Sequence, residues 1–295
     1  MKLHGVWVAT VSFFNADGSV DKESFRDHCS RLLNAKVDGL VPCGTTGEGP
    51  TLNSQERKAL IEIAASESLK HQKDVIAGCG GNYTEAVLKN IQEAHEAGAK
   101  AALVVTPYYN KPTQQGLLAH YTFLADKSPI PIVLYNVPSR TGVNLLPETV
   151  AELWKHPQII GLKEATGLHS QWLSLTSPVV PQNKYLLAGD DDAFATFSAL
   201  GGTGIISASA NVAPELFVSL SHHLEKQEWK EAFRLQKQLF SLIKSLFVES
   251  NPGPLKYALH RTFGTENKLR LPLVPVKRES EQLIERELRA LELLK

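Results

Sequence analysis

Eight short apolar segments, separated by segments with helical patterns, constrain the fold of this 295-residue chain most strongly. Most are almost continuously apolar and do not alternate with polar residues, as expected for parallel strands that are covered on both faces. A new segment begins every 19 to 36 residues, and this spacing fits a βα unit. Eight such units predict an α/β fold, a (βα)8 TIM barrel. The predicted strands are 6–10, 39–43, 75–79, 102–106, 130–135, 159–163, 185–188 and 204–207.

A doubly wound open sheet is the structural alternative. That fold more commonly has five or six strands and a glycine-rich phosphate-binding turn after the first. This chain has only Asp17-Gly18 at that place. The strand count and the missing turn both favour the barrel.

Helix boundaries can be read between the predicted strands. Asp21 is expected to cap a helix that runs to about residue 35. Asn53 followed by Glu56 resembles a capping box, and Thr84 is expected to cap a helix that ends near Gly98.

The pattern becomes purely helical after the eighth strand. Apolar residues at helical spacing predict one amphipathic helix around 232–247 and a last helix around 283–294. We therefore divide the chain into a catalytic barrel, residues 1–225, and a C-terminal helical bundle, residues 226–295. This bundle is expected to cover a barrel face or to contact a partner subunit.

Charge and cysteine content exclude several classes of protein. Lys plus Arg and Asp plus Glu both number 31, so the formal net charge is zero, and no basic stripe is present to bind nucleic acid. No apolar stretch approaches the roughly 18 residues that a membrane span needs. Cys29, Cys43 and Cys79 are widely spaced and lack a CxxC pair, so neither a disulfide framework nor a zinc site is expected. The composition predicts a soluble, cytoplasmic protein.

The C-terminal ends of the strands are where a (βα)8 barrel carries its active site. The second predicted strand is followed by a turn containing Thr45 and Thr46, within the sequence GTTGE. This turn either only relieves backbone strain or uses its hydroxyls and N–H groups to cradle a small carboxylate or phosphate. It lacks the spacing of a P-loop.

The fourth and fifth strands also end in polar side chains. Tyr108 and Tyr109 follow the fourth strand and are either packing residues or part of a site. Tyr135 ends the wholly apolar fifth strand, where its phenol needs a hydrogen-bond partner and could act as an acid or base. Arg140 follows, and it is either a solvated loop charge or a guanidinium that binds a carboxylate in bidentate fashion.

Lys163 is the most informative residue, because lysine seldom occupies a buried strand. Its stem could pack while its amine reaches water. Alternatively, a neutral lysine amine attacks a ketone and forms a Schiff base. Such an imine serves as an electron sink, so carbanion chemistry proceeds with no metal and no organic cofactor.

A metal site is not expected elsewhere. Asp190, Asp191 and Asp192 follow the seventh strand, but consecutive residues do not face one centre, and they equally cap a helix or bond to neighbouring loops. The histidines are scattered among the predicted helices and are expected at the surface. No Ser-His-Asp triad is suggested.

Five segments together resemble the dihydrodipicolinate synthase branch of the pyruvate-dependent class I aldolase family, which shares its barrel with N-acetylneuraminate lyase. They are GTTGE, TPYYN, YNVPSRTG, GLKEATG and GGTGIISASAN. Each alone is a weak signal, but five in the right order at five strand ends are specific. The resemblance runs from the first strand to the helix that begins near Asn251, essentially the whole chain.

The resemblance implies a role for each site residue. Lys163 forms the Schiff base with pyruvate, and Tyr135 beside it shuttles protons. Thr45 links Tyr135 to Tyr109, which reaches in from a neighbouring subunit. The resemblance further implies that three residues bind substrate: Thr46 the pyruvate carboxylate, Arg140 the carboxylate of the second substrate, and Ile206 through its carbonyl.

The implied reaction condenses pyruvate with aspartate 4-semialdehyde on the way to diaminopimelate and lysine. A lyase or aldolase for a sugar-derived 2-keto acid is the alternative within the family. Such lyases generally lack an arginine at position 140 and often have Ser-Thr where this chain has Thr45-Thr46. A catalytically silent barrel would show a broken relay, whereas the lysine, both tyrosines and Thr45 are all present.

The resemblance also bears on assembly and feedback. The usual form in this family is a homotetramer built as a dimer of dimers, although some relatives stop at dimers. Lysine-sensitive members typically carry serine and histidines or a tryptophan where this chain has Gly49, Ser54 and Arg57, and the loop from Asn82 looks one residue shorter. The sequence therefore predicts insensitivity to lysine.

Overall fold

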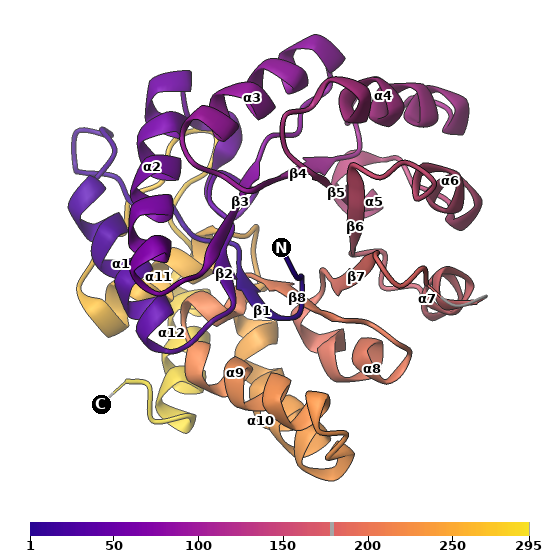
Figure 1. The fold of residues 1–295 in the computed structure, drawn as a ribbon. Coiled ribbons are helices and arrows are strands. Elements are labelled where there is room, and N and C mark those ends of the chain that lie inside the picture. Colours follow the sequence, from indigo (N-terminus) through magenta and orange to yellow (C-terminus); the bar gives the residue numbers. More distant parts are fainter. Residues whose placement is uncertain (178–179, 295) are drawn as a thin grey trace.

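Eight parallel strands close into a barrel in the computed structural model, which describes residues 1–177 and 180–294. Each strand pairs with the next along the chain, and the first pairs with the last. Figure 1 shows the strands as a ring with helices outside it. This arrangement confirms the predicted (βα)8 barrel. The strands are β1 (Gly5–Val8), β2 (Gly39–Leu40), β3 (Asp74–Gly78), β4 (Ala101–Val105), β5 (Ile132–Asn136), β6 (Ile159–Glu164), β7 (Tyr185–Ala188) and β8 (Gly204–Ser207).

The second strand is shorter than predicted, because β2 ends at Leu40 instead of residue 43. Pro42 has no N–H to donate to a strand neighbour. Cys43 has a φ of 62°, which lies in the left-handed region. The chain therefore leaves the sheet early and enters the loop that carries Thr45 and Thr46.

Within residues 1–177 and 180–294, nine α-helices lie between the strands or follow β8 directly, and two of them, α5 and α6, lie between β5 and β6. Asp21 accepts hydrogen bonds from the N–H groups of Glu23 and Ser24, and Asn53 and Glu56 form the predicted capping box. The cap at Thr84 was predicted wrongly, because Tyr83 precedes the helix and the Thr84 hydroxyl bonds instead to His120 Nδ1 at 2.9 Å. The helices are α1 (Lys22–Asn34), α2 (Ser54–Lys70), α3 (Thr84–Glu96), α4 (Gln114–Lys127), α5 (Pro138–Thr141), α6 (Pro147–Leu153), α7 (His169–Thr176), α8 (Phe194–Ala199) and α9 (Pro214–Glu225).

Two apolar layers cover the strands, one on each face. The larger layer lies between the strands and the outer helices. The smaller fills the inside of the barrel, and its members include Leu3, Trp7, Ile76, Leu103 and Leu187. Burial on both faces explains why the strand sequences do not alternate. Because both faces of the strands are apolar, polar side chains are expected at the ends of the strands.

The described residues after the barrel, up to 294, form three further helices: α10 (Trp229–Leu246), α11 (Gly253–Phe263) and α12 (Arg278–Ala290). α10 packs against α9 and α12, and α12 also packs against α11. Both predicted C-terminal helices are present, but α12 begins earlier than predicted and ends at Ala290, before the predicted end near residue 294. The apolar pattern of α10 covers more than its buried face, since Phe233 and Phe240 are 38% and 48% exposed. The domain boundary at residue 225 stays a prediction. No helix within residues 1–177 and 180–294 has the length and apolar character of a membrane span.

Candidate active site

A cavity of about 190 Å³ lies at the C-terminal ends of the strands. It collects side chains that are far apart in the sequence and that come from β5, β6 and α5, from the loops after β2 and β7, and from the segment between α10 and α11. Among its lining residues are Thr45, Thr46, Tyr135, Arg140, Lys163, Asp190 and Asn251. Five of the seven residues predicted from the sequence thus meet in one place, the other two being Tyr109 and Ile206.

Lys163 lies on β6, directly beside Tyr135 on β5. The two residues are register partners in the parallel ladder, so their side chains point to the same side of the sheet. Their exposed fractions are only 7% and 8%. Lys163 Nζ lies 4.4 Å from the centroid of the Tyr135 ring. The strands themselves therefore hold an amine against a phenol inside an enclosed cavity.

Glu164 follows Lys163 and points to the opposite side of β6, as strand alternation requires. It is fully buried and accepts hydrogen bonds from the side-chain amides of Asn136 and Gln171 and from the N–H of Thr166. Burial raises the pKa of this carboxyl, and the hydrogen bonds act against that shift. These hydrogen bonds hold the C-terminal end of β6 in place on the side of the strand opposite to Lys163.

The loop after β2 brings Thr45 and Thr46 to the opposite side of the cavity. Thr45 is half-buried and Thr46 only 4% exposed. Gly49 is required at its place, because a Cβ there would lie 2.4 Å from the Cys43 carbonyl oxygen. Asn251 donates from Nδ2 to Thr46 Oγ1 at 2.9 Å. The sequence patterns had not singled out Asn251 as a site residue.

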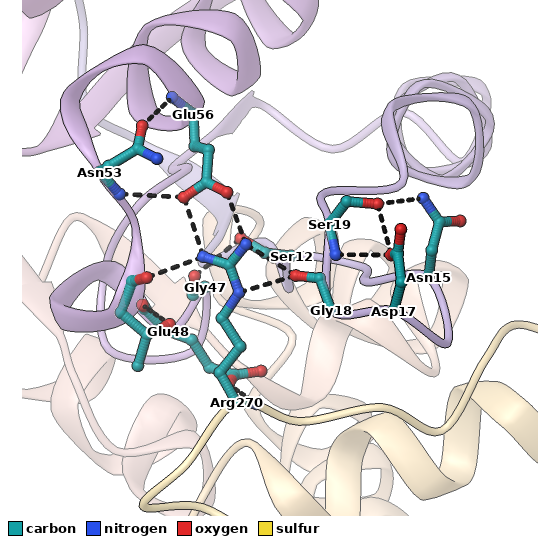
Figure 2. A network of polar contacts seen from close by, with 11 residues as sticks. Ser12, Asn15, Asp17, Gly18, Ser19, Gly47, Glu48, Asn53, Glu56 and Arg270 are labelled. Carbon is teal, nitrogen blue, oxygen red and sulfur yellow. Dashed lines mark hydrogen bonds and ion pairs between the residues drawn. The ribbon is translucent and has the colours of Figure 1, made fainter.

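Glu48 ties the same loop to the C-terminal helices. Lys256 Nζ lies 2.8 Å from Glu48 Oε1, and both side chains are fully buried. The other carboxylate oxygen, Oε2, accepts from the backbone N–H of Arg270 at 3.0 Å. Figure 2 shows how the Arg270 guanidinium then reaches Glu56 and the Gly18 carbonyl. These contacts span more than 200 residues, and no local pattern predicts them.

Arg140 lies on the short helix α5 and is exposed. It lines the Lys163 cavity and also a second cavity of about 520 Å³ that opens beside it. The second cavity is further lined by Gly49, Ser54 and Arg57. The region that the sequence singled out for feedback therefore adjoins the site, although lysine insensitivity stays a prediction.

Tyr109 does not line the Lys163 cavity. Its side chain is 87% exposed, and its φ of 74° lies in the left-handed region that bulky residues avoid. Tyr108 lines the larger cavity. Within one chain, Tyr109 thus lies outside the cavity that is lined by Tyr135 and Thr45, the two residues of the implied proton relay.

Ile206 lies on β8 and belongs to the apolar layer inside the barrel. It is fully buried, and Ala208, two residues later, lines the cavity. The place of Ile206 is therefore at the base of the site, below the polar side chains.

The three aspartates after β7 have different environments. Asp190 lines the cavity, and burial, with a contribution from Asp192, raises its pKa to about 6. Asp191 is buried and accepts hydrogen bonds from the backbone N–H and hydroxyl of Ser209, so the interpretation as a loop anchor is confirmed for this residue. Within the described part of the chain, no three His, Cys, Asp or Glu side chains are placed to hold a metal ion.

The prediction that the histidines lie at the surface is wrong for His28 and His120. Both are buried, with 5% and 6% exposure. His28 Nε2 lies 2.8 Å from Asn211 Oδ1, and burial, helped by the Arg31 charge, lowers the pKa of His28 to about 3. For His28, the partner Asn211 is 183 residues away in sequence and makes the burial tolerable, and helix periodicity alone could not reveal that partner.

Comparison with known proteins gives one consistent result. A model of the Dihydrodipicolinate synthetase family matches residues 2–291. The 4-hydroxy-tetrahydrodipicolinate synthase of Zymomonas mobilis is 42% identical over 270 residues, covering 91% of this chain and 92% of the relative. That of Anaeromyxobacter dehalogenans is 43% identical over 279 residues, covering 95% and 94%. The structure of dihydrodipicolinate synthase from Thermotoga maritima superposes with a TM-score of 0.96 at 38% identity, covering 99% of each chain. The chain belongs to the dihydrodipicolinate synthetase family.

Proposed function

We propose that this protein condenses pyruvate with aspartate 4-semialdehyde, the reaction of a 4-hydroxy-tetrahydrodipicolinate synthase, and so acts in diaminopimelate and lysine biosynthesis. The observation that carries the proposal is the buried Lys163 amine beside Tyr135, in a cavity that also holds Thr46 and Arg140. Curated relatives that match nearly the whole chain carry the name of this enzyme. Their agreement favours this function over an aldolase for sugar-derived acids.

The first step joins Lys163 to pyruvate. The free amine attacks the keto carbon, a carbinolamine forms, and loss of water gives an imine. In this proposal Tyr135 gives and takes the protons that this step moves, and the position of its ring, 4.4 Å from the Lys163 amine, supports that role. The imine then acidifies the methyl group, and removal of a methyl proton gives an enamine.

The second step forms the carbon–carbon bond. The enamine carbon attacks the aldehyde of aspartate semialdehyde, and the aldehyde oxygen takes up a proton. The substrate amine then attacks the imine carbon, and transimination releases 4-hydroxy-tetrahydrodipicolinate and the free Lys163 amine. The imine formed on Lys163 thus serves as the electron sink, and the reaction needs no oxidant or reductant.

Substrate binding is divided between two sides of the cavity. Thr46, with the backbone of Thr45, binds the pyruvate carboxylate, and Ile206 contributes its carbonyl below. Arg140 binds the carboxylate of the second substrate, since a guanidinium matches that group in bidentate fashion. The exposure of Arg140 supports this role, because the second substrate must enter after pyruvate is bound.

A proton relay through Thr45 and Tyr109 completes the proposal and requires a second subunit. Tyr109 is almost fully exposed in a single chain and strained in its backbone, as expected for a side chain that inserts into a neighbour. Exposed Phe233 and Phe240 on α10 support a further interface, and we infer a homotetramer. A cytoplasmic location stays a prediction of the sequence.

The assay that tests the function supplies pyruvate with aspartate semialdehyde and, separately, with aldehydes derived from amino sugars, and follows pyruvate consumption. Rapid turnover with aspartate semialdehyde alone is expected. Turnover only in the sugar series would overturn the substrate. An Arg140→Gln variant should lower kcat/KM for aspartate semialdehyde by about tenfold, the effect of one charge-assisted hydrogen bond, while pyruvate binding is retained.

A further inference from the structure

Asn251 belongs to the C-terminal region, yet its side chain lines the cavity in which pyruvate is proposed to bind. Asn251 lies between α10 and α11, and its exposed fraction is only 6%. It lines the same cavity as Lys163 and Thr46. Its Nδ2 group donates to Thr46 Oγ1 at 2.9 Å, across 205 residues of sequence. The C-terminal region therefore touches the hydroxyl that is proposed to bind substrate.

The direction of this hydrogen bond determines what the Thr46 hydroxyl can do. A threonine hydroxyl has one proton to donate and accepts through its lone pairs. Because the Asn251 amide donates to this oxygen, the hydroxyl proton stays free to be donated elsewhere. Thr46 lines the cavity, so that proton is available to an anionic oxygen bound there.

The loop that carries Thr46 is held firmly enough for such an orientation to persist. Glu48 is only two residues away, and its two carboxylate oxygens are bound by Lys256 and by the backbone of Arg270. Lys256 belongs to the first turn of α11, close to Asn251 in sequence. The hydroxyl and the amide that orients it are thus attached to one connected network (Figure 2 shows its Arg270 part).

We propose that Asn251 is a positioning residue for pyruvate, resting on the proposed function. Its amide orients the Thr46 hydroxyl so that the proton points to the pyruvate carboxylate. Asn251 Oδ1 is buried and has no hydrogen-bond partner within residues 1–177 and 180–294, so this side chain is linked to Thr46 through Nδ2. The C-terminal helical region then forms part of the substrate site and is more than a cover for the barrel.

Substitutions of Asn251 test the direction of the bond. Asn251→Ala should raise the KM for pyruvate by about tenfold, and should leave the KM for aspartate semialdehyde within about twofold. Asn251→Asp should have the larger effect, because a carboxylate accepts the Thr46 proton and also repels pyruvate. The pyruvate concentration that gives half-maximal borohydride labelling of Lys163 measures the same binding without the second substrate.

A double substitution separates orientation from general damage. In a Thr46→Val background there is no hydroxyl to orient, so Asn251→Ala should add less than about twofold. Gln236→Ala is the matched control, because Gln236 is an equally buried amide on α10 that bonds to Asp191 O and the Ala195 N–H outside the cavity. Its pyruvate KM should match the parent.

Three outcomes would overturn the proposed role of Asn251. Unchanged pyruvate KM in Asn251→Ala, a smaller effect of Asn251→Asp than of Asn251→Ala, or a full additional loss in the Thr46→Val background overturns the proposal. If Asn251→Ala does not fold, Asn251→Ser is measured in the same way. Failure of the parent protein to label Lys163 with pyruvate would instead overturn the proposed function.

Discussion

The two sides of the cavity are held in place by different means. On one side, Lys163 and Tyr135 are neighbours in the strand ladder of β5 and β6, 28 residues apart in sequence. On the other, the loop with Thr46 and Glu48 is fixed by Asn251, Lys256 and Arg270, across 205 to 222 residues. In the proposed reaction, the strand side (Lys163 and Tyr135) carries the amine and the phenol, and the loop side (Thr46 and Glu48) carries the hydroxyl that binds pyruvate. The proposed chemistry thus depends on local sheet geometry, and the proposed pyruvate binding depends on contacts with the C-terminal region.

Substituting the buried lysine of the loop side should give the largest loss of stability. Lys256→Met leaves the Glu48 carboxylate buried without a cation, which should lower the free energy of unfolding by about 3–5 kcal/mol. Denaturant unfolding measures this change. Lys155→Met, which breaks an exposed pair with Glu152, is the control and should cost no more than about 1 kcal/mol. Equal losses in the two variants would show that the buried pair does not hold the loop.

Substituting the tyrosine of the strand side should instead affect the rate. Tyr135→Phe should lower kcat by about 10²-fold or more, because it removes the proton carrier beside the amine, and should hardly change unfolding. Steady-state kinetics and a melting curve provide both values. Tyr121→Phe removes another buried hydroxyl, which bonds to the Val104 carbonyl away from the cavity, and should leave kcat unchanged. A similar kcat for both variants would argue against the proton role.

The strand side could be predicted from the sequence better than the loop side, because its contacts follow from the order of the strands. Strand ends meet at one edge of a barrel, so Lys163, Tyr135 and Arg140 could be grouped from the order of the strands alone. The place of Tyr109 relative to them could not, since its expected partner lies in another subunit. Asn251 and Lys256 were missed because nothing local distinguishes them. Their partners are set by how the last helices pack, and periodicity does not determine that.

The smallest expected effect is a change in the KM for pyruvate caused by Asp190, which lines the same cavity as Lys163 and Thr46. Burial raises its pKa to about 6, so it is ionised at pH 7.5 and becomes neutral as the pH falls below about 6. An ionised carboxylate repels pyruvate, and its protonation removes that repulsion. The KM for pyruvate should therefore fall by about threefold between about pH 7.5 and about pH 5.5. Asp190→Asn should show the lower KM throughout and no such step. A step of the same size in that variant would assign the titration to another group.

Trapping of the imine tests the central claim most directly. Borohydride added with pyruvate should reduce the imine and label the peptide that contains Lys163, as read by mass spectrometry, with no label in the absence of pyruvate. Lys184→Ala is a suitable control, because Lys184 is also buried but donates to the carbonyls of His156 and Ile159. That variant should keep the label if it folds, and Lys163→Ala should lose it. A label that persists in Lys163→Ala, or that lies on another lysine, would contradict the account.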